Sequence, residues 1–366
     1  MTDLYDRVVE RAREIRTDAY SMSIGEVISL YRDGDLEIHP EFQRIFRWDI
    51  DQRSRLIESI LLGIPIPTVF VAQREDGVWD VIDGVQRLST ILEFVGEYKD
   101  EDGNQQPASA LVGGEYLREL EGIGWSDTTP DATSNLDDRL QRDFKRAKLS
   151  FSIIKRESDP NAKFDLFQRL NAGSTLSLQE ARNCLLIMVN RPAYLVLSEL
   201  TQDGSFNDCI SVSEQKENAA YKSELVLRFF AQLEYSSGNE QLSDEFGTYL
   251  TDWMKLRAEA GIEFLDTDLF RRTFDLLSRS LGSESFRRYD GSRHLGAFSI
   301  SSYEFITSGV ASNIAFWEGQ KPEILADRIR STWSDPTFRA NSGSGISSRK
   351  RFPRMVNSGR EFFASA

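Results

Sequence analysis

A short polar stretch in the first half of the chain has the residue types that bind a phosphate group. It reads Asp83-Gly84-Val85-Gln86-Arg87 and stands between a segment that favours a strand, 78–82, and apolar residues at helical spacing, 88–95. The N-terminus of a helix leaves backbone N–H groups unpaired and carries the positive end of the helix dipole. Gly84 lets a ligand approach the backbone, and the guanidinium of Arg87 matches two phosphate oxygens. The pattern predicts an anion site, although an ordinary capped helix explains the same residues.

Asp83 and Gln86 stand beside this predicted site, and each has more than one use. Asp83 can cap the following helix or hold a metal ion bound to phosphates, and Gln86 can donate or accept a hydrogen bond. Together with Arg87 they form the predicted catalytic group. A string this short is weak by itself, so other segments must supply further groups.

Two distant segments carry polar groups that suit the wall of the same pocket. Gln43 and Arg44 lie in a stretch without clean periodicity, which is typical of a loop. Arg169 and Asn171 end a predicted helix at a turn. A surface arginine explains the first pair as well, and a left-handed turn residue explains the second. The expected nucleotide-binding set is Gln43, Arg44, Gly84, Arg87, Arg169 and Asn171.

The elements that position these groups are marked by caps and by periodicity. Capping signals predict helices that start after Ser23, Asp49 and Ser177. Residues 68–72 and 78–82 favour two strands joined by a turn, and 148–155 favours another strand. The predicted anion site therefore follows a β-hairpin.

The length of 366 residues predicts two domains after a leading helix. The leading helix is placed at 1–20, the pocket domain at 21–215, and a mainly α-helical domain at 216–366. Within the pocket domain the polar segment 99–142 is expected to be a surface insertion.

Composition restricts the kinds of protein that this chain can be. We expect a cytoplasmic protein without a membrane segment, because the sequence has no apolar run of about 18 residues and no apolar secretory segment. The only two cysteines, Cys184 and Cys209, are expected to be buried small hydrophobic residues. Only two histidines, His39 and His294, are present, so neither a histidine-rich metal site nor an HNH nuclease site is expected. His294 is expected to be a lone surface or packing residue.

A basic tail near the C-terminus contrasts with the formal net charge of −14. The four cations are Arg349, Lys350, Arg351 and Arg354. They could contact DNA or RNA locally, although charge runs of this size are usually solvated surface.

Four ordered motifs resemble the N-terminal domain of GmrSD-type modification-dependent restriction enzymes, a family distantly related to the ParB and sulfiredoxin fold. The motifs are Phe42-Gln43-Arg44 with Trp48, the segment 55–67, the segment 81–90, and the segment 166–173 followed by Glu180-Ala181-Arg182-Asn183. They cover roughly residues 20–190. The resemblance implies an α+β fold, with a small ParB/sulfiredoxin-like mixed-sheet domain before the helical domain.

The resemblance also assigns nucleotide binding and hydrolysis to Asp83, Gly84, Gln86 and Arg87, supported by Gln43 and Arg44. Two departures matter. The first Gln of the family's Asp-Gly-Gln-Gln-Arg motif is Val85 here, which leaves open whether the chain is a nucleoside triphosphatase or only binds nucleotide. The second half also lacks the residues of an appended HNH nuclease.

The leading hypothesis is therefore an NTP-binding regulatory component of a prokaryotic anti-phage defence or restriction system that acts with a separately encoded nuclease. Its expected cofactors are a nucleoside triphosphate and Mg²⁺. The alternatives are a non-enzymatic ParB-like DNA-binding module and a self-contained ParB-like nuclease. The preferred base, the trigger, the partner, contact with DNA and a homo-oligomeric state all remain open.

Overall fold

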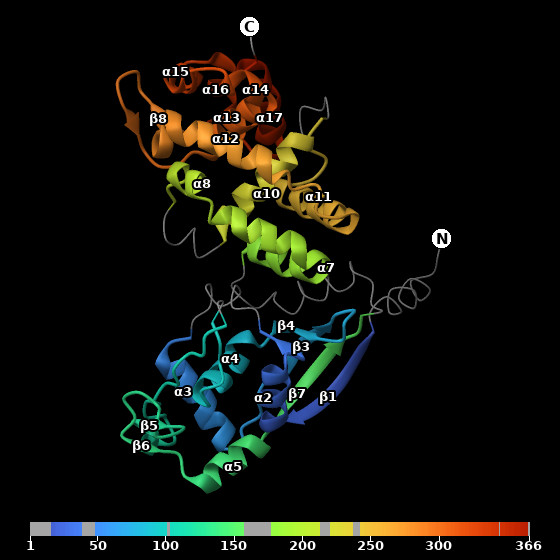
Figure 1. The fold of residues 1–366 in the computed structure, drawn as a ribbon, viewed down its shortest axis with the longest axis vertical. Helices are drawn as coiled ribbons and strands as arrows, with labels where there is room; N and C mark the ends of the chain where they lie inside the picture. Colours follow the sequence, from blue (N-terminus) through green and yellow to red (C-terminus); the bar gives the residue numbers. More distant parts are fainter. Residues whose placement is uncertain are drawn as a thin grey trace. The chain divides into compact units, whose positions relative to one another are not determined.

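The computed structural model of the chain describes residues 16–38, 48–100, 103–156, 177–212, 220–236, 242–343 and 345–364. The chain divides into two compact units, Met1–Thr175 and Leu176–Ala366 (Figure 1). The first unit is built around a sheet, and the second consists mainly of helices. The expected fold, a mixed-sheet α+β domain before a helical region, is confirmed.

A five-stranded mixed sheet forms the centre of the first unit. Its strands follow the order β1-β7-β3-β4-β2, in which β1/β7 and β3/β4 are antiparallel while β7/β3 and β4/β2 are parallel. The predicted hairpin is β3 and β4, and the predicted third strand is β7. The strands are β1 Thr17–Ser23, β2 Leu36–Glu37, β3 Val69–Gln73, β4 Trp79–Asp83 and β7 Lys148–Ile154.

Four α-helices accompany this sheet in the described part of the first unit, and two of them start at predicted caps. The hydroxyl of Ser23 accepts the N–H of Glu26, and Asp49 and Gln52 form the reciprocal capping box at the start of α3. The helices are α2 Ile24–Asp33, α3 Ile50–Leu61, α4 Val85–Phe94 and α5 Asp138–Arg146. Their buried apolar faces supply much of the core of this unit.

The polar segment between α4 and α5 packs more closely than expected for a surface insertion. Leu111, Leu120 and Leu136 are buried in the core of the first unit. The buried carboxylate of Glu58 in α3 accepts the backbone N–H groups of Tyr116 and Leu117, at 2.8 and 2.6 Å. This segment also contains three short elements, η2 Arg118–Leu120, β5 Ile123–Gly124 and β6 Ser134–Asn135.

The described part of the second unit has its regular structure in helices, apart from η3 Gly282–Glu284 and the hairpin β8 Arg288–Tyr289 with β9 His294–Leu295. Its α-helices are α7 Leu178–Thr201, α8 Gly204–Cys209, α10 Tyr221–Glu234, α11 Phe246–Ala260, α12 Thr267–Ser280, α13 Ile300–Ser312, α14 Ile314–Glu318, α15 Pro322–Thr332, α16 Pro336–Asn341 and α17 Ser348–Phe362. The predicted capping box of Ser177 and Glu180 starts α7.

Helix α13 lies in the middle of this unit, and residues 301–311 are all buried. It crosses α17 closely at two glycines. A Cβ atom placed on Gly359 would lie 2.1 Å from the carbonyl oxygen of Phe305, and one on Gly309 would lie 2.4 Å from the carbonyl oxygen of Gly359. Only residues without a side chain fit this crossing.

Helix α7 is the one helix in the described part of the chain that is long and apolar enough, by length and composition, to cross a membrane. Its backbone departs from helical geometry at Asn190, where φ is −153° and ψ is 82°. The side chain of Asn190 donates to the carbonyl groups of Ala258 and Gly261 and accepts the N–H of Ala193. Buried residues along α7 pack against α10 and α11, as in a core helix of a helical domain.

The two cysteines and the second histidine of the chain are packing residues. Cys184 and Cys209 are buried free thiols, and burial raises the pKa of Cys209 to about 12. The side chain of His294 is buried, with its ring 4.9 Å from that of Tyr289. The other histidine, His39, lies outside the described residues.

Candidate functional site

The predicted anion site lies where β4 passes into α4. Gly84 occupies the N-cap position with φ 99° and ψ 9°, a left-handed conformation that favours glycine. A Cβ atom at this position would lie 3.0 Å from the side chain of Val69 and 3.3 Å from the guanidinium of Arg87. The turn therefore needs glycine for its backbone angle and for the close approach of its neighbours.

The structure corrects the expectation that Asp83 caps this helix. No side chain caps the start of α4 among the described residues. Oδ2 of Asp83 instead accepts a hydrogen bond from Nη2 of Arg87 at 2.6 Å. The amide groups of the first turn are thus left without a carboxylate cap, as an anion-binding helix start requires.

Arg87 is less exposed than arginine side chains usually are. Its side chain is 12% exposed, and Nη1 donates to the carbonyl oxygens of Pro67 and Thr68. The guanidinium therefore ties the start of α4 to the loop that leads into β3. An exposed arginine in the first turn of a helix contributes little to packing, whereas the contacts of Arg87 give its side chain a structural role.

Gln86 connects the predicted site to Trp48, the first described residue after the predicted loop that contains Gln43 and Arg44. Its Oε1 accepts the backbone N–H of Trp48 at 3.1 Å. The side-chain amide nitrogen of Gln86 remains the group with which it can donate to a ligand. Asp83, Gln86 and Arg87 are therefore gathered around one helix start.

Four of the predicted site residues lie outside the described residues. They are Gln43, Arg44, Arg169 and Asn171. Their place in the pocket stays a prediction, together with the idea that Arg44 and Arg87 flank the same anion.

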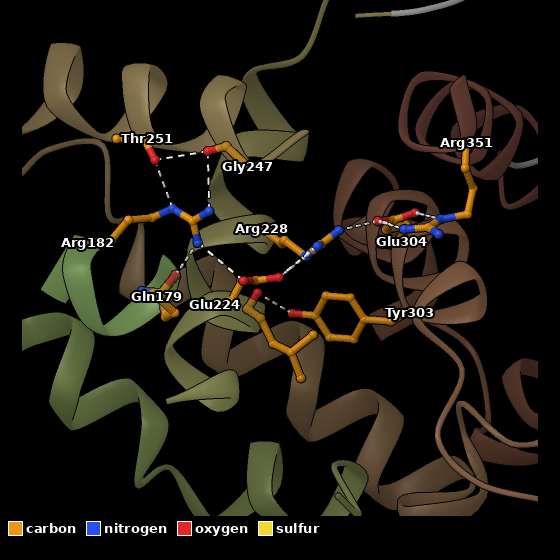
Figure 2. Close-up of polar contacts among 10 residues, drawn as sticks. Gln179, Arg182, Glu224, Arg228, Gly247, Thr251, Tyr303, Glu304 and Arg351 are labelled. Carbon is orange, nitrogen blue, oxygen red and sulfur yellow. Dashed lines mark hydrogen bonds and ion pairs between the residues drawn. The ribbon is translucent and has the colours of Figure 1, made fainter. Parts of the chain in front are cut away.

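Arg182, from the last of the four motifs, takes part in a buried polar network in the second unit (Figure 2). Its guanidinium donates to Gln179 at 2.7 Å and to Glu224 at 3.2 Å. It also donates to the hydroxyl of Thr251 and the carbonyl oxygen of Gly247. These bonds tie α7 to α10 and α11, so the structure gives Arg182 a packing role.

The network continues from Glu224 through Arg228 to Glu304 and Arg351 (Figure 2). Glu304 is fully buried and accepts from Arg228 at 2.5 Å and from Arg351 at 3.0 Å. Burial disfavours ionised Glu224, but the charges of Arg228 and Arg182 outweigh it and lower its pKa. Five charges of alternating sign thus connect α7, α10, α13 and α17.

Sequence reasoning missed this network, although one signal for it is visible. Arg228 interrupts the apolar run 225–231 of a predicted helix. A cation on a buried helix requires a carboxylate partner, and the partner Glu304 is far away in the sequence.

The predicted nucleic-acid tail forms the first turns of α17 and makes contacts within the second unit. Arg349 donates to the carbonyl oxygen of Leu242, Arg351 pairs with Glu304, and Arg354 donates to the side chain of Asn341. Lys350 is exposed. The guanidinium groups of the tail thus have partners inside the protein.

A metal site built from several protein ligands is not visible in the ranges that the structure describes. No group of three or more His, Cys, Asp or Glu side chains there could hold an ion. Asp83 stands as a single carboxylate beside the helix start. One carboxylate suits Mg²⁺ that is bound mainly through nucleotide phosphates and water.

A family comparison gives the first unit a relationship to known proteins. Residues 24–187 match the model described as GmrSD restriction endonuclease, N-terminal domain. The matched segment makes up less than half of the chain and ends within α7. Neither a curated protein nor a solved structure gave a match. The match confirms the family resemblance for this segment and indicates a component of a restriction or anti-phage system.

Proposed function

We propose that this chain binds a nucleoside triphosphate at the start of α4 and serves as a regulatory component of a restriction or anti-phage system. The observation that carries the proposal is the α4 N-terminus, where Gly84 replaces a side-chain cap and Arg87 lies alongside. Its amide groups and helix dipole favour an anion.

In this proposal each residue at the helix start has a distinct role. The first-turn amides and Arg87 bind phosphate oxygens, and Gln86 donates from its amide nitrogen. Asp83 holds Arg87 in place before the nucleotide binds, through the 2.6 Å ion pair. When a phosphate takes over part of the Arg87 guanidinium, the carboxylate of Asp83 becomes available to Mg²⁺ on the same phosphates.

Binding without turnover is the simplest role for a site that contains Val85. A valine side chain can neither donate nor accept a hydrogen bond, so it cannot orient an attacking water molecule. We propose that nucleotide occupancy itself is the regulatory signal. A steady release of inorganic phosphate by the purified chain would contradict this part of the proposal.

DNA cleavage is assigned to a separately encoded nuclease. The whole chain contains only two histidines, and the described residues hold no cluster of metal ligands. A self-contained ParB-like nuclease has little support for the same reason. A DNA-binding module that relies on the tail has little support because Arg349, Arg351 and Arg354 have intramolecular partners.

The proposal is tested by thermal unfolding with each of the four ribonucleoside triphosphates and Mg²⁺. A ligand that binds only the folded state raises the melting temperature, so at least one nucleotide should do so. Arg87→Lys keeps the positive charge but loses the forked geometry, and it should reduce the nucleotide-induced shift. The matched control is Arg53→Lys, which alters an arginine paired with Glu93 in the last turn of α4.

The control variant should retain the shift of the parent. The nucleotide pocket is contradicted if no triphosphate raises the melting temperature of the parent, or if Arg87→Lys and Arg53→Lys give equal shifts. Because each variant is compared with itself without nucleotide, a loss of basal stability does not affect the outcome.

A further inference from the structure

Helix α5 presents a row of cations to solvent. Arg139, Arg142, Lys145 and Arg146 are exposed, and the exposed Lys148 follows at the start of β7. The helical repeat places positions 139, 142 and 146 on one side. The opposite side holds Phe144, which is buried against the rings of Phe94 and Trp125. The charged side therefore faces away from the core.

These cations are not neutralised by ion pairs with neighbouring carboxylates. In the described ranges, no ion pair is formed by Arg139, Arg142, Arg146 or Lys148. The pKa of the N-cap Asp137 is lowered by backbone N–H groups of Leu140 and Arg139 and then by the charges of Arg139 and Arg142. Segment 138–148 holds five cations and two carboxylates in a chain of net charge −14. A local positive surface remains.

We propose that α5 and Lys148 form a contact surface for the phosphate backbone of duplex DNA. At 1.5 Å per residue, positions 139 and 146 are separated by about 10.5 Å along the helix. This distance is close to the roughly 12 Å width of the major groove, so the row can reach phosphates on both sides of the groove. Arginine forks match phosphate oxygens, and such contacts position DNA without reading its sequence.

An anionic membrane fits this surface less well than DNA does. A helix that lies in a membrane interface buries an apolar face among the lipids. The apolar face of α5 is occupied by the core, because Phe144 is 1% exposed. What α5 offers to a partner is its charge, and the regular charge of a nucleic acid backbone is complementary to it.

The basic surface lies away from the start of α4, because Phe144 of α5 contacts Phe94, the last residue of α4. The strand registers pair Asp83 with Phe70, and Phe70 with Ser152. Lys148 is four residues before Ser152 on β7, about 13 Å along the strand. The contact with DNA therefore does not depend on nucleotide at the start of α4.

The test measures binding of the full chain to a fluorescent duplex DNA of random sequence by anisotropy, without nucleotide, over a range of salt concentrations. The variant is Arg142→Glu with Arg146→Glu. Its affinity should fall by at least roughly tenfold, and the slope of log affinity against log salt should decrease by about 0.9 for each phosphate that the variant no longer neutralises. The control, Lys321→Glu with Arg339→Glu, makes the same charge change at exposed cations of the second unit.

The control should bind nearly as tightly as the parent. The inference is overturned if the parent does not bind the duplex, if the α5 variant binds as the parent does, or if both variants lose the same affinity. Binding to anionic vesicles or polyglutamate but not to DNA would overturn it as well. Should the charge reversal disturb folding, Arg142→Gln with Arg146→Gln supplies the same comparison with a smaller perturbation.

Discussion

Helices α5 and α17 both carry closely spaced cations in an acidic chain, and their surroundings differ. On α17, Arg349 and Arg351 bond within the second unit, and Arg351 pairs with the buried carboxylate of Glu304. On α5, Arg142 and Arg146 are exposed and form no ion pair with the described residues. A run of cations in a sequence can therefore be part of a core or form a surface, and the location of its carboxylate partners decides which.

The largest effect of a single substitution on stability is expected in the ion-pair network that includes α17. Glu304→Gln removes one charge that serves both Arg228 and Arg351, while Glu304 itself is fully buried. Removing one partner of a buried ion pair costs about 3–5 kcal/mol, because the remaining charge is left uncompensated. Urea unfolding followed by circular dichroism should show a loss of this size in the free energy of unfolding.

The matched control for this prediction is Glu318→Gln. Glu318 pairs with Arg272 at an exposed position, where water screens the charges. Its replacement should change the free energy of unfolding only slightly. If the two variants were equally stable, the buried network would not hold the second unit together and the contrast between the helices would lose its basis.

The contrast also shows how much of this molecule could be predicted from its sequence. The caps at Ser23, Asp49 and Ser177 and the hairpin β3/β4 depend on residues close together in the chain, and all of them were predicted. Gly84 was expected to let a ligand approach the backbone, and the structure adds that its left-handed backbone angle favours glycine.

The environment of each arginine could not be predicted in this way. The carbonyl partners of Arg87 lie about twenty residues earlier, at Pro67 and Thr68, and Arg351 finds Glu304 on another helix. Periodicity shows which face of a helix is apolar, but it does not show which distant element covers that face. The basic tail was therefore considered for nucleic acid, while the exposed cations of α5 were overlooked.

A smaller effect on the free energy of unfolding is expected when the pH is lowered. The pKa of Glu224 is lowered, since the charges of Arg228 and Arg182 outweigh its burial. A depressed carboxyl pKa gives stability that is present above the unfolded pKa and lost as the pH falls through the folded pKa. At neutral pH the parent should therefore have a larger free energy of unfolding than Glu224→Gln. The difference in unfolding free energy between the two proteins should become smaller as the solution is acidified from about pH 5.

Glu180 in helix α7 provides a control, because its effect on stability should change with pH in the opposite direction. Burial raises its pKa, more than its hydrogen bonds with Ser177 lower it. A raised carboxyl pKa gives stability that is present below the unfolded pKa and lost as the pH rises through the folded value. Relative to Glu180→Gln, the parent should thus become more stable on acidification. If acidification reduced the difference in unfolding free energy between the parent and both variants, the assignment of Glu224 to an ion-pair network would be contradicted.

The smallest effect on the free energy of unfolding is expected for the exposed cations of α5. Arg142→Gln with Arg146→Gln should leave the free energy of unfolding within about 0.5 kcal/mol of the parent, because exposed side chains without partners contribute little to stability. Arg351→Gln, one matched change on α17, should cost roughly 1–3 kcal/mol, because it leaves Glu304 with one fewer charged donor. Both are measured by urea unfolding. A stability loss for the α5 pair as large as that for Arg351→Gln would mean that α5 holds the fold together, and its cations would then no longer be available as a surface for DNA.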